Sequence, residues 1–266
     1  MKKGILIVII ILLVLVLLFS GWKMLGILAD YRQGEAMYEE MDQFVSIPET
    51  TVKPTVATEP TEEITEPEAE SVKTEKTFTA PEVDFKKLWK VNKDVVGWIY
   101  IPDTKVNYPI LQGRNNDQYL RHMINGKYNT AGSIFLEAGI ADDFSSRNNP
   151  IYGHNMKNGT MFADVSKYKQ QKFYDEHPVG FLVTPEKTYT VFFFSGYVLS
   201  AYGNAWDTSF SEAEFGKWLD KACSKSYFAS DVTPTKDHKV LTLSTCSYET
   251  DTSRFVVHGI LEEYEP

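Results

Sequence analysis

The stretch Thr242-Leu243-Ser244-Thr245-Cys246 decides the fold of this 266-residue chain. It closes a β-type run that begins at Lys239, and it leaves a thiol where the strand pattern stops. Eight positions later, Arg254 opens a second β-type run over residues 255–260. Two strands joined by a short loop are predicted to be antiparallel neighbours, so the thiol and the guanidinium should share one end of a sheet. A thiol beside a fixed cation can act as a nucleophile, whereas an isolated buried thiol usually does not.

The second cysteine has a structural explanation. In the run from Phe215 to Cys223 the apolar positions 215, 218, 219, 222 and 223 fall on one helical face. Cys223 is therefore expected to be a small buried hydrophobic residue. A disulfide between the two cysteines would also suit an extracytoplasmic protein. Cys246 has no comparable explanation, which leaves it free for chemistry.

A cysteine nucleophile needs a proton donor or acceptor nearby, and the chain has five histidines. Four have plain structural interpretations, namely a polar helix, a helix end, a polar turn and pairing across a strand, for His122, His177, His238 and His258 respectively. His154 differs because it follows the short apolar strand 150–152 and Gly153, which permits an unusual backbone angle. On spacing alone, a catalytic and a structural role for His154 are equally supported.

The amino-terminal part of the sequence has an apolar run of 18 residues, Ile5 to Trp22, preceded by two lysines. A helix rises about 1.5 Å per residue, so this run would be about 27 Å long, close to a hydrocarbon core of about 30 Å. A cleaved signal peptide is the rival interpretation, but its apolar region is shorter and ends in a small-x-small site that is not clear here. The pattern favours an uncleaved, single-pass anchor over residues 1–28, with the amino terminus in the cytoplasm.

Residues 29–80 form a second predicted segment, a juxtamembrane helix to residue 44 and then a stretch rich in Thr, Glu and Pro. Between residues 45 and 80 eight glutamates oppose three lysines, so much of the formal net charge of −9 belongs to this stretch. Such a composition cannot bury a core, and we expect a disordered, self-repelling spacer. No basic stripe suggests a nucleic-acid partner, and no clustered ligand pattern suggests a metal site.

Residues 81–266 are dense in aromatic residues and short strand signals, which suits one domain. Helices are expected at 84–93, 161–174 and 211–228, and strands at 96–101, 106–111, 132–136, 150–152, 179–183, 188–199, 239–246 and 254–262. Many short strands with a few inserted helices predict a mostly β domain that closes into a barrel. No glycine motif for phosphate binding occurs, and no cofactor is expected.

These residues resemble those of a known family, the sortases. Thr242 to Cys246 matches the TLxTC signature, Arg254 matches the arginine that follows it, and His154 in Tyr152-Gly153-His154-Asn155-Met156 matches the family histidine. The resemblance covers residues 82–264 and is fairly specific, because three separated elements occur in the expected order. The expected helices 84–93 and 211–228 are most similar to those of class B.

The resemblance implies a membrane-anchored cysteine transpeptidase, grouped with the thiol peptidases, on a closed eight-stranded sortase barrel outside the cytoplasm. By this resemblance, Cys246 attacks the carbonyl of a threonine in the carboxyl-terminal sorting motif of a secreted protein and forms a thioacyl-enzyme. An amine on a cell-wall precursor or on another protein then takes over the acyl group. His154 gives a proton to the departing amine and takes one from the incoming amine, while Arg254 holds the substrate carbonyl or the oxyanion.

The resemblance to class B also points to an NPxTN-like motif on iron- or haem-acquisition proteins. Other motifs and a pilin-joining acceptor stay open. Ser244, Thr245 and Asn155 are candidates for lining the substrate groove, although strand and turn packing explains them equally well.

Three other functions stay in view. An L,D-transpeptidase also uses cysteine, but that family places a His-Gly pair just before it, whereas this chain has Leu243-Ser244-Thr245. A thiol protease would resolve the same acyl-enzyme with water, and the sequence barely separates that outcome from transpeptidation. A non-catalytic binding module on a stalk would explain the anchor and the spacer, but it would not require Cys246, His154 and Arg254 together.

Overall fold

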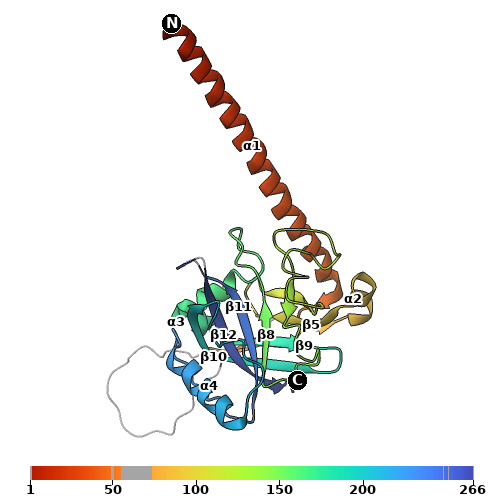
Figure 1. The fold of residues 1–266 in the computed structure, drawn as a ribbon. Helices are drawn as coiled ribbons and strands as arrows, with labels where there is room; N and C mark the ends of the chain where they lie inside the picture. The colour runs from red at the N-terminus through yellow and green to blue at the C-terminus, as the bar shows by residue number, and fades with distance from the viewer. Residues whose placement is uncertain (1, 49–50, 55–73, 248, 251, 266) are drawn as a thin grey trace, which may run out of the picture.

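The computed structural model describes residues 2–48, 51–54, 74–247, 249–250 and 252–265. One long helix, α1 (Lys2–Met41), projects from a β-barrel and carries the amino terminus far from the rest of the molecule (Figure 1). Residues 55–73, where the sequence predicts a disordered spacer, lie outside the described residues. The division of the chain into segments at residues 28 and 80 stays a prediction.

Eight strands close the barrel in the order β10–β12–β11–β8–β7–β6–β5–β9, which confirms the predicted closed eight-stranded fold. The strands are β5 (Val95–Tyr100), β6 (Asn107–Leu111), β7 (Ile134–Leu136), β8 (Asn148–Tyr152), β9 (Val179–Val183), β10 (Thr188–Ser200), β11 (Lys239–Cys246) and β12 (Ser253–Glu263). Two neighbouring pairs, β8 with β11 and β6 with β7, run parallel, and the other pairs are antiparallel.

Alternation along the strands separates two apolar clusters. On β12, Phe255 and Val257 belong to the main cluster inside the barrel, whereas Val256 and Ile260 belong to a second cluster on the outer face. Helix α4 (Glu212–Ser224) covers that outer face (Figure 1), and its amino terminus is closed by a capping box between Ser211 and Glu214. The even-numbered positions of β12 therefore face α4 and the odd-numbered positions face the interior.

Cys223 is exposed, contrary to the sequence prediction of a buried residue, and both cysteines are free thiols. The buried stripe of α4 consists of Phe215, Trp218, Leu219 and Ala222. At about 100° per residue, Cys223 lies about 90° from the centre of that stripe, at its edge. It also sits in the last turn, because α4 ends at Ser224 and not at the predicted residue 228.

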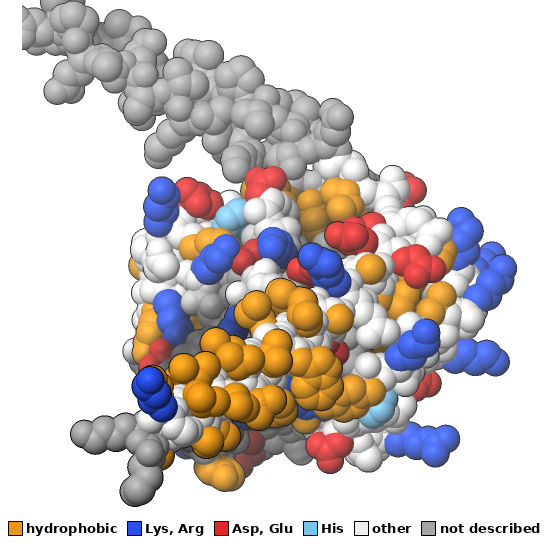
Figure 2. Space-filling view, turned by 90° about the horizontal axis from the view of Figure 1, so that it is seen from above, with side chains coloured by type: hydrophobic (Ala, Val, Ile, Leu, Met, Phe, Trp, Pro, Cys, Tyr) orange, Lys and Arg blue, Asp and Glu red, His pale blue; other side chains and the backbone are white. Residues whose placement is uncertain are grey.

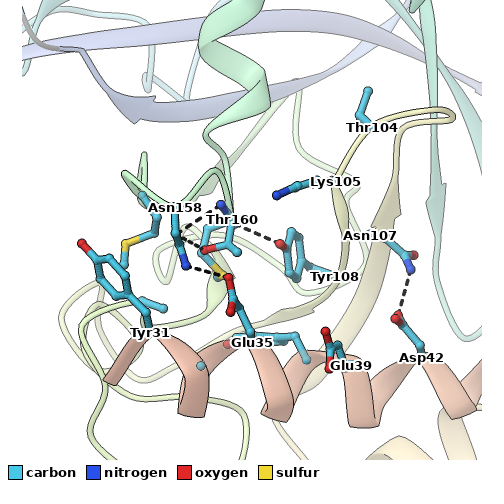
Figure 3. Close-up of a pocket in the computed structure, with 15 residues that line it drawn as sticks. Tyr31, Glu35, Glu39, Asp42, Thr104, Lys105, Asn107, Tyr108, Asn158 and Thr160 are labelled. Carbon is cyan, nitrogen blue, oxygen red and sulfur yellow. Dashed lines mark hydrogen bonds between the residues drawn. The ribbon is translucent and has the colours of Figure 1, made fainter. Parts of the chain in front are cut away.

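The carboxyl-terminal part of α1 packs against the barrel (Figure 3). The Tyr38 hydroxyl donates to the Gly132 carbonyl at 2.5 Å, and Met41 is only 1% exposed. About one turn before Tyr38 on the helix, the Glu35 carboxylate accepts a hydrogen bond from Asn158 Nδ2 of the barrel domain at 3.0 Å. These contacts join the helix directly to the domain that carries the barrel.

The remaining elements are short. They are a 3₁₀ helix (Asp42–Phe44), β1 (Val45–Ser46), β2 (Thr51–Pro54), β3 (Thr74–Thr77), β4 (Glu82–Val83), α2 (Phe85–Val91), a second 3₁₀ helix (Asp164–Lys169) and α3 (Gln171–Glu176). The last two replace the single helix predicted over residues 161–174. β1 pairs with β4, so that Val45 lies opposite Val83, and β2 pairs with β3.

The first part of α1 is apolar and exposed. Large hydrophobic side chains with more than 40% of their surface exposed follow one another from Ile5 to Leu28. By length and composition, this helix is able to cross a membrane.

Candidate active site

The ends of three adjacent strands bring the predicted catalytic residues together. β8 and β11 run parallel, with Tyr152 opposite Ser244. Cys246 is paired in turn with Arg254 on β12. His154 follows the end of β8 by two residues and lines the same cleft as Cys246 and Arg254. Residues in one row of a pleated sheet share a face. Cys246 and Arg254 therefore form one row across β11 and β12, and His154 borders the same cleft from the segment after β8.

This row borders a cleft of about 540 Å³. Beside His154, Cys246 and Arg254, the cleft is lined by Leu120 and Arg121 from the loop after β6, and by Trp206 from the segment after β10. A backbone hydrogen bond extends the contact between β8 and β11 just past the end of β8: the Gly153 N–H donates to the Ser244 carbonyl at 3.1 Å. The strand ends are therefore tied together where they meet the cleft.

His154 is held by a backbone carbonyl. Its Nε2 lies 2.8 Å from the Leu120 oxygen. A carbonyl oxygen only accepts, so Nε2 carries the ring proton, and Nδ1 of the neutral ring keeps a lone pair. Burial lowers the pKa of His154, the Leu120 bond opposes that shift, and the charges of Arg121 and Arg254 lower it further. The imidazole is therefore neutral at neutral pH and able to accept a proton.

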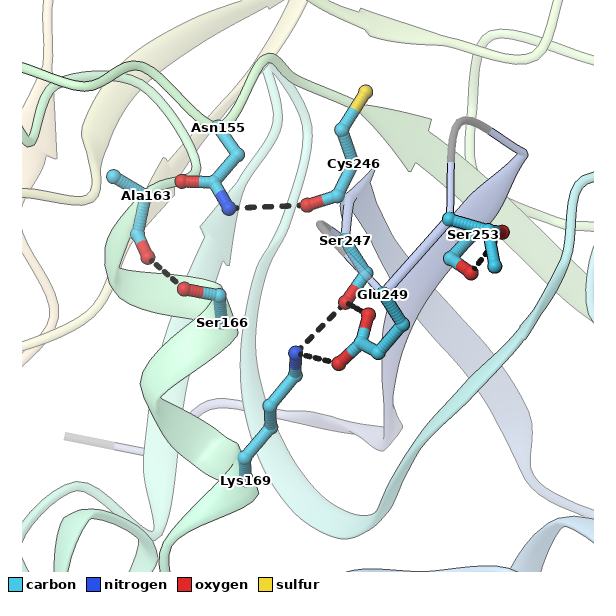
Figure 4. A network of polar contacts seen from close by, with 9 residues as sticks. Asn155, Ala163, Ser166, Lys169, Cys246, Ser247, Glu249 and Ser253 are labelled. Atoms are coloured by element: carbon cyan, nitrogen blue, oxygen red, sulfur yellow. Dashed lines mark hydrogen bonds and ion pairs between the residues drawn. The ribbon is translucent and has the colours of Figure 1, made fainter.

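Asn155 contacts the backbone of the nucleophile. Its Nδ2 donates to the Cys246 carbonyl at 3.0 Å, while the Cys246 sulfur points away from this bond (Figure 4). Asn155 thus ties the segment after β8 to the end of β11. It lines a neighbouring groove and not the cleft itself.

Ser244 and Thr245 also border the cleft but expose little surface. Ser244 is 3% exposed, and its hydroxyl accepts a hydrogen bond from Trp206 Nε1 at 3.0 Å. Thr245 is 2% exposed, and its buried hydroxyl has no hydrogen-bond partner among the described residues. The role of these two residues and of Asn155 in substrate binding stays a prediction.

The turn between Cys246 and Arg254 is anchored from the neighbouring 3₁₀ helix (Figure 4). Lys169 Nζ donates to Ser247 Oγ at 2.7 Å and to Glu249 Oε1 at 2.6 Å, and the Ser247 hydroxyl donates to the same carboxylate. The bonds from Lys169 and Ser247 lower the pKa of Glu249 to about 2. A charged carboxylate therefore holds this turn at all but strongly acidic pH.

Two contributors to the site carry no motif in the sequence. Leu120 acts through its backbone carbonyl, so its side-chain type gives no signal. Trp206 lies in a loop, and only its aromatic character distinguishes it. Tyr202, which follows β10, is 89% exposed and does not line the cleft.

A second imidazole lies on the same sheet face but is sealed from solvent. His258 is opposite Thr242, as expected for pairing across a strand. Its Nδ1 lies 2.8 Å from Thr242 Oγ1 and its Nε2 3.1 Å from the Tyr197 hydroxyl. The indole of Trp218 on α4 lies edge-on with ring centroids 5.0 Å apart. Burial lowers the pKa of His258 to about 3.

Within the described ranges, no group of three or more acidic, histidine or cysteine side chains is placed to hold a metal ion.

Comparison with known proteins places the chain. The sortase domain matches residues 99–262. Sortase B of Listeria monocytogenes is 38% identical over 181 residues, which make up 67% of this chain and 74% of that protein. A crystal structure of Staphylococcus aureus sortase B has a TM-score of 0.65 at 34% identity and covers 68% of this chain and 87% of that one. One of Bacillus anthracis sortase B has a TM-score of 0.71 at 29% identity, covering 90% of this chain and 100% of that one.

The chain therefore belongs to the sortase family, whose members are cysteine transpeptidases. Within the family it is similar to class B, because these relatives and solved structures are all sortases B.

Proposed function

We propose that this chain is a membrane-anchored class B sortase in which Cys246 is the nucleophile, His154 the proton carrier and Arg254 the group that stabilises the oxyanion. The observation that supports this proposal is that all three residues line one cleft, with Cys246 and Arg254 paired on adjacent strands. The substrate is the carboxyl-terminal sorting motif of a secreted protein, cleaved after its threonine.

In the first step the neutral imidazole of His154 takes the proton of the Cys246 thiol, and the sulfur adds to the threonine carbonyl. The carbon–nitrogen bond then breaks, and His154 returns the proton to the departing amine. A thioester between Cys246 and the threonine remains. The incoming amine adds to the carbonyl carbon of that thioester, and His154 takes the proton that the amine loses. The carbon–sulfur bond then breaks, a new amide is formed, and His154 returns its proton to the Cys246 thiolate.

In this proposal the guanidinium of Arg254 faces the oxygen of the attacked carbonyl, where negative charge develops. A fixed donor aimed at a developing oxyanion contributes about 3–4 kcal/mol to lowering the barrier. Its location in the same row as the thiol is what this role needs, because the oxygen of the attacked carbonyl is within a bond length of the carbon that the sulfur attacks. The Arg254 Nη1 bond to the Ser253 carbonyl, at 3.0 Å, restricts the side chain.

Solved relatives guide the choice of substrates. One structure is a Staphylococcus aureus sortase B–substrate complex, and another sortase B was solved with triglycine, each 33% identical to this chain. For this chain we propose an NPxTN-like motif as the donor and a primary amine of a cell-wall precursor or protein as the acceptor.

The proposal includes the amino-terminal helix as the anchor. The exposed apolar side chains from Ile5 to Leu28 would lie in the bilayer, with the amino terminus in the cytoplasm and the barrel outside. The docked part of α1 then connects the membrane to the catalytic domain without an intervening linker.

The test is a peptide assay with the full chain in detergent, because a fragment starting at residue 81 would lose the contacts of Tyr38 and Met41. An NPxTN-like peptide is incubated with and without triglycine, and the products are read by mass spectrometry. We expect a ligated product that depends on triglycine and on Cys246.

Equal hydrolysis with and without triglycine would instead identify a thiol protease, the second candidate function. A panel of peptides with altered motifs separates an inactive protein from a wrong motif. Failure to form a thioacyl adduct with any peptide of the panel would refute the proposed activity.

A further inference from the structure

A second groove, of about 640 Å³, lies beside the cleft. Trp22, Lys23 and Ile27 form its wall on α1, and Arg121 and Lys157 form part of its wall on the barrel. The groove and the cleft share residues, because Arg121 and His154 line both. Cys246 and Arg254 line the cleft and not this groove.

The groove lies at the end of the apolar part of α1. Exposed hydrophobic side chains continue to Leu28, and Asp30 is the first acidic residue of the chain. Trp22 and Lys23 are residue types that collect at membrane–water interfaces, since the indole is amphipathic and a lysine ammonium reaches out to the headgroups. With α1 inserted in a bilayer, as in the proposed function on which this inference rests, the groove opens at the level of the lipid headgroups.

The charge of the groove is mainly positive. Lys23, Arg121 and Lys157 line it against a single carboxylate, Asp30. That carboxylate accepts hydrogen bonds from the backbone N–H and the hydroxyl of Thr130. Within the part of the chain that the structure describes, no ion pair involves any of the three cations. Three cations without an anionic partner at a membrane surface are suited to a phosphate group.

Apolar surface adjoins these cations. Trp22 is 69% exposed and Ile27 53% exposed, and both belong to the groove wall. Figure 2 looks down on the side from which α1 projects, and a band of hydrophobic side chains crosses the front of this view with Lys and Arg side chains around it. A soluble anion would use only the cations, whereas a lipid would use the cations and the apolar wall together.

We propose that this groove binds an anionic membrane phospholipid, with the phosphate between Lys23, Arg121 and Lys157 and the first part of the acyl chains along Trp22 and Ile27. Because Arg121 and His154 line both the groove and the cleft, a headgroup bound in the groove places the cleft next to the bilayer surface. A sorting motif whose protein is still in the membrane would meet the thiol there.

The test uses the full chain in detergent, and native mass spectrometry counts the molecules of phosphatidylglycerol or phosphatidylcholine that it retains. The double variant Lys23→Gln/Lys157→Gln removes a cation from each wall. The control, Lys217→Gln/Lys221→Gln, removes two exposed cations of α4, which does not line the groove. Arg121 stays unchanged because it also lines the cleft.

We expect the wild type and the control to retain phosphatidylglycerol in preference to phosphatidylcholine. The groove variant should bind phosphatidylglycerol about tenfold more weakly, since each cation near an anionic surface contributes several-fold to affinity. Equal retention of the two lipids by the wild type, or equal weakening in both variants, would overturn the proposal. Full displacement of the lipid by millimolar inorganic phosphate would identify a general anion site and overturn the lipid assignment.

Two further measurements separate this inference from the proposed function. Extraction of membranes with alkaline carbonate tests whether α1 is inserted, and release of the chain would refute both the anchor and the lipid site. Ligation of a soluble peptide tests the transpeptidase. A chain that is inserted and active, yet shows no lipid preference, would refute the lipid site alone.

Discussion

Two rows of side chains cross the same face of β11 and β12, and they hold related groups in opposite settings. Thr242 and His258 form one row, a hydroxyl beside an imidazole, sealed under α4 with both ring nitrogens engaged. Four residues along β11, Cys246 and Arg254 form the other row, which opens on the cleft. A polar group beside an imidazole is therefore structural where α4 covers the sheet, and it is available for catalysis only where the sheet extends past that helix.

The largest effect should come from the open row. Cys246→Ala removes the only group there that can form the thioester, so peptide cleavage should fall by more than about 1,000-fold. The melting temperature should change little, because the residue lies at the edge of the cleft. Initial rates and thermal unfolding measure the two effects.

The matched control is Cys223→Ala, which removes the exposed thiol of α4. We expect unchanged turnover and a change in the free energy of unfolding of at most about 0.5 kcal/mol, as for surface sites. If Cys246→Ala keeps its activity while Cys223→Ala loses it, the assignment of the nucleophile is wrong.

The next effect concerns the cation of the open row. Arg254→Lys keeps the charge but loses the planar pair of donors, and kcat should fall about 100-fold while KM changes less. Steady-state kinetics with the peptide substrate measure both constants. The same change at Arg147 should leave kcat unaltered. Arg147 does not line the cleft, and its Nη1 donates to the Lys236 carbonyl at 2.6 Å. A purely structural Arg254 would instead show lower stability with normal kcat.

The sealed row should affect stability and not catalysis. His258→Asn breaks a buried hydrogen-bond network and should lower the free energy of unfolding by about 1–3 kcal/mol. Activity per folded molecule should stay near that of the wild type. Chemical denaturation and an active-site titration give the two values, and a large loss of activity per folded molecule would contradict the separation of the rows.

The same residue gives a pH dependence. The pKa of His258 is lowered to about 3 in the folded protein, from an ordinary value of 6.5. Between these values the unfolded chain binds a proton that the folded chain refuses, so stability falls as pH drops from 6.5 towards 3. This group contributes up to about 1.4 kcal/mol per pH unit. His258→Asn should flatten that slope, measured by chemical denaturation across this pH range. An unchanged slope in the variant would contradict the assignment to His258.

The smallest effect concerns the turn that joins the members of the open row. Glu249→Gln and Lys169→Met should each slow kcat several-fold, because the turn between Cys246 and Arg254 loses its anchor. The double variant should be no slower than the worse single variant, since both changes break one interaction. Lys187→Met and Glu263→Gln, which break a pair 2.9 Å apart elsewhere on the surface, should be silent. Fully additive losses would show that the two residues act separately.

The sequence predicted the ends of β11 and β12 well, because a short loop between two β-type runs leaves few ways to pair them. The neighbour on the other side could not be predicted locally. β8 and β11 pair in parallel, although 86 residues separate the end of one from the start of the other. Periodicity carries no information about such a crossover. The place of His154 beside Cys246 was therefore expected from family resemblance and not from spacing.

Other differences have local causes. The segment around His122 was expected to be a polar helix, but it forms turns and an isolated bridge between His122 and Tyr128. Its polar residues instead cap and close turns, as Asn115 does by accepting from the N–H groups of Asp117 and Gln118. No sequence pattern indicated a role for Lys169, because its partners Ser247 and Glu249 lie far away in the chain.

The pairing of Val45 with Val83 has a consequence for reach. Since β1 and β4 are adjacent, residues 46 and 82 lie side by side although 35 residues separate them in the sequence. The acidic stretch between them therefore has both of its ends at neighbouring positions on the domain, and its length does not determine the distance between α1 and the barrel. With α1 inserted in a bilayer as proposed, removing residues 55–73 should leave the distance from the thiol to the bilayer unchanged, because the docked part of α1 would set that distance.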